Sequence, residues 1–85
     1  MVNIKFEPDR NRAAAYDGDN PIGECVFTHA DTTWTITHTE VDSAYGGQGI
    51  AGRLVDAVVA QAREHGMELA ATCSYARHRL ARKSQ

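Results

Sequence analysis

The stretch of residues 41–54 constrains this chain more than any other, because it leads from a β-patterned segment through glycines into an amphipathic helix pattern. Gly46, Gly47 and Gly49 leave the backbone free to turn and let a ligand approach closely. A helix start also presents unpaired N–H groups and the positive end of the helix dipole. The stretch therefore predicts either a glycine turn between a strand and a helix or an anion site, most naturally for a phosphate.

Four strands are predicted before these glycines, from runs of alternating or β-branched residues. They cover residues 2–7, 12–16, 22–29 and 32–41. Alternation along the fourth strand predicts that Trp34, Ile36, His38 and Glu40 share one face, with threonines on the other. His38 and Glu40 would then continue an apolar stripe with ionisable groups.

Beyond the glycines, apolar residues recur at helical spacing and a further β-patterned run follows. The sequence predicts a helix over residues 47–65, a fifth strand over 67–72 and a short helix over 74–82, capped by Ser74. Strands four and five flank one helix, which predicts a parallel, right-handed crossover, while the first four strands are close enough for antiparallel hairpins. The predicted fold class is α+β: a mixed, mostly antiparallel five-stranded sheet with one long crossover helix and a short C-terminal helix.

The glycine stretch and its surroundings resemble the acetyl-CoA pyrophosphate loop of the GNAT superfamily of N-acetyltransferases. That pattern is a hydrophobic strand end, then R/Q-x-x-G-x-G/A, then a helix. The first loop position is usually Arg or Gln and is Gly46 here, so one side-chain contact is lost while the backbone donors remain. The resemblance implies that the cofactor is held by Val41, Gly46, Gly47, Gln48, Gly49, Ile50, Ala51 and Gly52.

Three motifs between residues 37 and 75, T-H-T-E-V, Y-G-G-Q-G-I-A and T-C-S-Y, are similar to those of the small YjdJ-type branch of this superfamily. The resemblance implies one minimal GNAT-like domain over residues 1–85, without the helices that larger members insert after the first strand. It also implies that strands four and five splay apart around acetyl-CoA. The acetyl group would pass to an amine acceptor that the sequence does not identify.

Two residues are candidates for catalysis, because transfer to an amine needs a proton acceptor and a way to handle the thioester. His38 can take an amine proton near neutral pH, or it is a satisfied, partly buried histidine. Cys73 precedes a helix start, where a thiolate is favoured, or it is a small buried hydrophobe. The small branch carries both residues, which favours a function for each. Either His38 or a water relay deprotonates the amine for direct attack, or Cys73 first takes the acetyl group after activation by His38.

The alternative to an enzyme is a non-catalytic acyl-CoA-binding or protein-interaction module of the same fold, which needs neither His38 nor Cys73. No G-K-S/T follows the glycines, so a P-loop nucleotide site is disfavoured. A basic cluster near the C-terminus is interpreted mainly as a solvated helix end, with contact to an anionic ligand as the alternative. The cluster comprises Arg77, Arg79, Arg82 and Lys83.

Length and composition bound the class of protein. A chain of 85 residues, 42% hydrophobic and 24% charged, predicts one globular domain. A net charge of −2 argues against general nucleic-acid binding, and no apolar run is long enough to cross a membrane. Cys25, interpreted as core, and Cys73 make no disulfide framework, and the spacing of histidines and cysteines predicts no metal site. We expect a cytoplasmic protein with reduced thiols that is a monomer or a weak homodimer.

Overall fold

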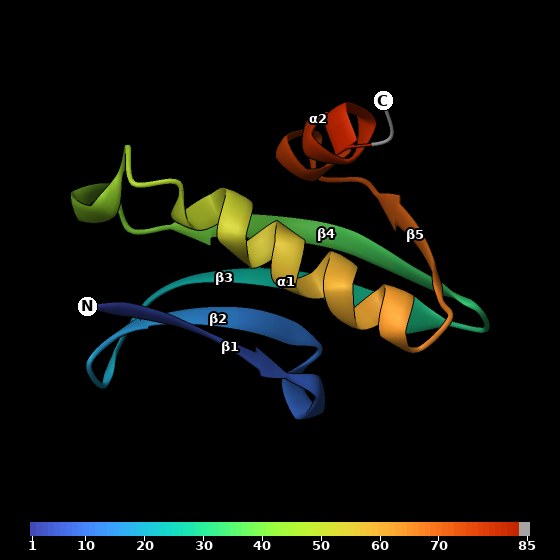
Figure 1. The fold of residues 1–85 in the computed structure, drawn as a ribbon, viewed down its shortest axis with the longest axis horizontal. Coiled ribbons are helices and arrows are strands. Elements are labelled where there is room, and N and C mark those ends of the chain that lie inside the picture. Colours follow the sequence, from blue (N-terminus) through green and yellow to red (C-terminus); the bar gives the residue numbers. More distant parts are fainter. Residues whose placement is uncertain (84–85) are drawn as a thin grey trace.

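The computed structural model describes residues 1–83 and shows one five-stranded sheet with a long helix across one face (Figure 1). The strands are β1 (Val2–Glu7), β2 (Arg12–Asp17), β3 (Asn20–Ala30), β4 (Thr33–Val41) and β5 (Glu68–Ala71). The helices are α1 (Ile50–Glu64) and α2 (Ser74–Lys83), and short 3-10 turns cover Pro8–Arg10 and Ser43–Tyr45. Within residues 1–83, neither helix has the length and apolar character that a membrane crossing requires.

Strand pairing confirms the predicted fold class. The strands β1 to β4 pair antiparallel with their neighbours, whereas β5 runs parallel to β4 after the chain crosses over through α1. The predicted boundaries differ from the observed ones by a few residues. The largest difference is at α1, which begins at Ile50 rather than at residue 47. Gly47 and Gly49 take left-handed backbone angles, with φ of 78° and 74°, and such residues do not continue a right-handed helix.

The apolar face of α1 packs on the sheet and forms the core. Leu54 and Val58 of α1 are fully buried there. At the end of the sheet farther from the glycine loop, the ring of Phe27 stacks on Trp34 with centroids 4.5 Å apart and on Phe6 at 5.9 Å. Truncating a buried leucine such as Leu54 to alanine costs about 2–5 kcal/mol of stability. The packed core therefore holds α1 in a fixed position against β4.

One irregularity in β4 decides which side chains reach which face of the sheet. Val26 of β3 pairs with His38, but the next residue, Phe27, pairs with Ile36. Thr37 therefore has no paired residue in the β3 ladder and forms a β-bulge, with its hydroxyl 3.5 Å from the Val26 carbonyl. An extra residue of this kind breaks the two-residue alternation of side chains, so the strand changes its facing beyond Thr37.

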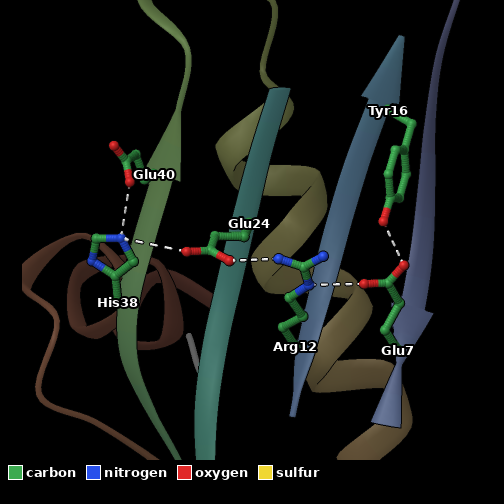
Figure 2. A network of polar contacts seen from close by, with 6 residues as sticks. All are labelled: Glu7, Arg12, Tyr16, Glu24, His38 and Glu40. Atoms are coloured by element: carbon green, nitrogen blue, oxygen red, sulfur yellow. Dashed lines mark hydrogen bonds and ion pairs between the residues drawn. The ribbon is translucent and has the colours of Figure 1, made fainter. Parts of the chain in front are cut away.

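The prediction that Ile36, His38 and Glu40 share one face is therefore wrong. Before the bulge, Ile36 is fully buried beneath α1. After it, Thr39 faces the α1 side, with its hydroxyl 3.6 Å from the buried thiol of Cys25. His38 and Glu40 lie on the opposite face, which no helix covers in the part of the chain that is described (Figure 2). We call this the open face of the sheet.

Candidate active site

The pairing of β4 with β5 ends halfway along β4. The last parallel pair joins Ile36 to Ala71, and the N–H groups of Thr72 and Cys73 then both donate to the Ile36 carbonyl, at 2.9 and 3.3 Å. The chain next turns away into α2. In the described part of the chain, residues 37–41 therefore keep one backbone edge free, next to the gap between the two strands. A free strand edge can pair with an extended ligand.

The free edge of β4 leads to the start of α1. Gly49 is the N-cap, and its carbonyl accepts the first helical hydrogen bond from Arg53 at 3.1 Å. No side chain among residues 1–83 caps this end, and its first turn holds no acidic residue. The N–H groups of Ile50, Ala51 and Gly52 remain as donors at the positive end of the helix dipole. This arrangement suits an anion.

The other predicted loop residues lie around these donors. Val41 ends β4 and packs against the core, Gly47 takes its left-handed turn, and Gln48 is exposed. Gly46 has an ordinary extended conformation, with φ of −63°. A Cβ built on Gly46 would meet only the Ser43 carbonyl, at 3.3 Å, so a small shift admits a side chain. Backbone strain therefore does not require glycine at residue 46.

Gly52 lets α2 approach the first turn of α1. A Cβ at Gly52 would stand 2.8 Å from Cζ of Arg79, so the guanidinium occupies the space that a side chain would take. Asp56 holds the guanidinium there, with Nε to Oδ1 at 3.1 Å and Nη2 to Oδ2 at 2.9 Å. One member of the C-terminal basic cluster thus lies beside the anion site, which linear sequence does not show. The side chains of residues 82–83 lie outside what the structure describes.

Cys73 lies at the junction of the strand gap and α2. Its carbonyl accepts the N–H of Arg77 at 2.9 Å, so it takes the N-cap place of α2. Its Sγ lies 3.7 Å from Oγ1 of Thr39 on β4. Partial burial raises the pKa of the Cys73 thiol, but its hydrogen bonds with the Ala76 N–H, the Thr39 hydroxyl and the Tyr75 N–H outweigh it and leave the pKa below its ordinary value.

Two predictions about this region need correction. Ser74 is the first residue of α2 and not its cap, because Cys73 occupies the cap place. One of the two predicted routes has His38 activate Cys73, but the bulge places His38 on the opposite face of β4. The side chain of β4 that contacts the thiol is that of Thr39. The thiol is therefore tuned by a helix start and a hydroxyl, and not by an imidazole.

His38 belongs to a polar network on the open face of the sheet (Figure 2). Its Nε2 lies 3.2 Å from Oε1 of Glu40 and 3.9 Å from Oε2 of Glu24. Nη1 of Arg12 donates to the other oxygen of Glu24 at 2.9 Å. With the proton on Nε2 shared with these carboxylates, Nδ1 is the nitrogen that can accept a proton from another molecule.

The network continues across the sheet to β1. Nε of Arg12 donates to Glu7 at 2.8 Å, and the hydroxyl of Tyr16 donates to the second Glu7 oxygen at 2.5 Å. The Tyr16 bond, followed by that of Arg12, lowers the pKa of the Glu7 carboxyl. Because Arg12 is held by Glu7, it fixes Glu24 beside His38. Sequence reasoning singled out neither Arg12 nor Glu24, since the two come from different strands.

Comparison with known proteins places this geometry in a family. A family model described as GCN5-related N-acetyl-transferase matches residues 12–85. The chain belongs to this family. Its members are acetyltransferases that take the acetyl group from acetyl-CoA. A search of curated protein sequences finds no match.

Solved structures agree with this membership. A GCN5-like putative N-acetyltransferase from Staphylococcus aureus is 33% identical, with a TM-score of 0.74 over 96% of this chain and 80% of that one. A probable acetyltransferase from methicillin-resistant S. aureus shares the fold at 14% identity, with a TM-score of 0.72 over 99% and 88% of the two chains. A GNAT family acetyltransferase from Elizabethkingia anophelis, solved with acetyl-CoA bound, shares the fold at 18% identity, with a TM-score of 0.68 over 99% and 73%.

Proposed function

We propose that this GNAT protein transfers an acetyl group from acetyl-CoA to the nitrogen of an amine. The observation that carries the proposal is the continuous path from the free edge of β4 to the uncapped start of α1. An extended pantetheine arm can pair with residues 37–41, and a pyrophosphate can then meet the N–H groups of α1. Acetyl-CoA carries these two parts in that order, which brings its thioester to the gap beside Cys73.

Loop residues 46–52 would hold the pyrophosphate through their backbone, with Val41 packed beside the pantetheine arm. Arg79 supplies the charge-assisted contact that Gly46 lacks, because its guanidinium already lies on the first turn of α1 at Gly52. In the free protein Asp56 shares this guanidinium. An arginine has five N–H donors, so it can keep one carboxylate contact and add a phosphate contact.

The transfer follows from the groups around the gap. An ammonium group first gives one proton to Nδ1 of His38, which Glu40 orients through Nε2. The neutral nitrogen then attacks the carbonyl carbon of the thioester, a C–N bond forms and the C–S bond breaks. The second proton of the nitrogen passes to the leaving thiolate. The products are the N-acetylated amine and a free thiol, and His38 returns its proton to water.

Cys73 takes the acetyl group before the amine in this proposal. Its lowered pKa favours the thiolate, which attacks acetyl-CoA and exchanges one thioester for another as coenzyme A leaves. The amine then attacks the acetyl group on Sγ by the steps given above. The support for this route is the place of Cys73 at the gap and at the start of α2.

Thermal unfolding in the presence of acetyl-CoA tests the cofactor site. A hundredfold excess over Kd should raise the free energy of unfolding by about 2.7 kcal/mol. Gly49→Val should remove this ligand shift. Gly66→Val is the matched control, because Gly66 at the other end of α1 has a similar φ of 70° and no atom near its missing Cβ. No shift at millimolar acetyl-CoA in the unmodified protein would reject the site.

Mass spectrometry of amines incubated with the protein and acetyl-CoA tests the transfer. Acetyl-CoA binding without acetylation of any amine would reject the enzyme and favour the non-catalytic acyl-CoA-binding module.

A single minimal domain over residues 1–85, a cytoplasmic location and a monomeric or weakly dimeric state remain predictions. Size-exclusion chromatography at several concentrations checks the oligomeric state.

A further inference from the structure

The open face of the sheet carries a cavity of about 400 Å³ that the acetyl-CoA path does not use. Its wall includes Arg12, Glu24, Glu40 and Asp42. Arg12 is already bonded to Glu24 and to Glu7, so its charge is balanced. Among the described residues, no lysine or arginine pairs with Glu40 or Asp42. The cavity therefore has an excess of negative charge and suits a cation.

The cavity adjoins the place of acetyl transfer through two consecutive residues of β4. His38 contacts Glu24 and Glu40 in the cavity wall. The next residue, Thr39, points the other way and contacts the thiol of Cys73. Beyond Ile36 no ladder of hydrogen bonds joins β4 to β5, so backbone pairing does not separate the two faces there. An amine held at His38 can reach the thioester around this free edge.

We propose that this cavity binds the acetyl acceptor and that the acceptor is a primary amine carrying a second positive charge, an inference that rests on the proposed function. The reacting ammonium lies at Nδ1 of His38, because Nε2 faces Glu24 and Glu40, and it loses its proton there as described above. The second charge lies toward Asp42, four residues after His38 and one residue beyond the end of β4, about 13 Å away along an extended chain. Long-chain diamines and basic peptides share this chemistry.

An organic cation fits these residues better than a metal ion. Glu24, His38 and Glu40 do place three potential ligand atoms within 4.8 Å of one another. However, Arg12 holds one oxygen of Glu24, Glu40 is exposed, and the cavity is much larger than an ion. A divalent metal is therefore a competing outcome of the test.

The test compares acetylation of 1,7-diaminoheptane with that of heptylamine, which lacks the second charge. We expect kcat/KM to be about tenfold higher for the diamine, as one charge-assisted contact provides. Asp42→Asn should bring this ratio close to one, whereas Glu40→Gln, beside His38, should lower the turnover of both amines and keep the ratio. Asp31→Asn, in the turn between β3 and β4, removes the same charge outside the cavity and should keep the ratio. Acetylation of a lysine–arginine dipeptide, measured in parallel, shows whether a basic peptide or a free diamine is the better acceptor.

A second measurement keeps the inference separate from the proposed function. The ring signals of His38 in NMR should shift on titration with the diamine, in the presence of coenzyme A, more than with heptylamine. Equal turnover of both amines, unchanged in Asp42→Asn, overturns the inference and leaves the transferase. No turnover of any amine overturns the transferase, and the NMR titration then decides the binding site. Displacement of the diamine by low micromolar Zn²⁺ or Mn²⁺ would assign the cluster to a metal instead.

Discussion

The two faces of β4 beyond Thr37 carry opposite chemistry. On the side of α1, Thr39 lies between two thiols, with Cys25 at 3.6 Å and Cys73 at 3.7 Å. On the open face, His38 lies between two carboxylates. One strand therefore separates groups suited to an acyl thioester from groups suited to an amine. The bulge at Thr37 creates this division, because it reverses the facing of every residue after it.

The two thiols beside Thr39 show what sets the reactivity of a cysteine. Cys25 is fully buried, as predicted for a core residue, and burial raises the pKa of its thiol to about 11. Cys73 shares the same hydroxyl neighbour but also receives N–H groups from the start of α2, and its pKa is lowered. The burial of Cys25 and the helix start at Cys73, rather than the shared hydroxyl, therefore make the difference.

Inserting one alanine between Thr37 and His38 should disturb the two faces of β4 most severely. If the single-residue bulge is kept, every later residue of β4 shifts by one position against β3, which turns His38 toward the buried side of the sheet and Thr39 away from Cys73. Burial of an unpaired polar side chain should lower the free energy of unfolding by about 1–3 kcal/mol, as measured by urea denaturation. Thr35→Ala, before the bulge, is the control and should change stability far less. Native-like stability after the insertion would contradict this account of the facing of β4.

Acetylation of Cys73 tests whether the two faces act in separate steps. Protein incubated with acetyl-CoA should carry an acetyl group on Cys73, as mapped by mass spectrometry. His38→Ala should still acquire this group, because His38 lies on the other face, but should lose about 10²–10⁴-fold in transfer to an amine. Cys25→Ala is the control and should keep both steps. Full transfer by Cys73→Ala would reject the covalent route and leave Cys73 as packing.

Replacing Gly46 by arginine tests how the side of the sheet that faces α1 binds coenzyme A. Gly46→Arg should tighten coenzyme A binding by roughly tenfold, since it restores a charge-assisted phosphate contact at a site without backbone strain. Arg79→Gln should weaken binding, and Gly46→Arg should compensate for it in the double variant. Isothermal calorimetry measures all three proteins. Weaker binding by a well-folded Gly46→Arg variant would mean that the loop needs glycine there.

The open face should show its own dependence on pH. Hydrogen bonds from Tyr16 and Arg12 place the folded pKa of Glu7 below its ordinary value of 4.5. Glu7 therefore contributes stability above pH 4.5, and this contribution is lost as pH falls through the lower folded value. The loss should be about 1 kcal/mol or less, since the pair is partly exposed. Denaturation of Glu7→Gln between pH 2 and 6 should show a flatter profile, and an unchanged profile would contradict this role.

The residue pattern of the sequence predicted those secondary-structure elements that depend on residues close together in the chain. The strand alternation, the four-residue repeat of α1 and the glycines before it predicted the order of elements and the crossover, and the observed pairing confirms them. The free donors at the start of α1 lie where the glycine motif predicted an anion site. Such features depend on residues that are neighbours along the chain, so a single sequence contains them.

The sequence by itself determined the fold class, the glycine loop and the two candidate residues His38 and Cys73. Only the tertiary structure decided that these two residues lie on opposite sides of β4, because one residue without a ladder partner, Thr37, shifts the strand and no local pattern marks it. It also brought Arg79 onto Gly52, 27 positions earlier in the chain. Contacts between distant segments form when the apolar faces of helix and sheet are buried together, and that packing sets the register of the polar groups they carry.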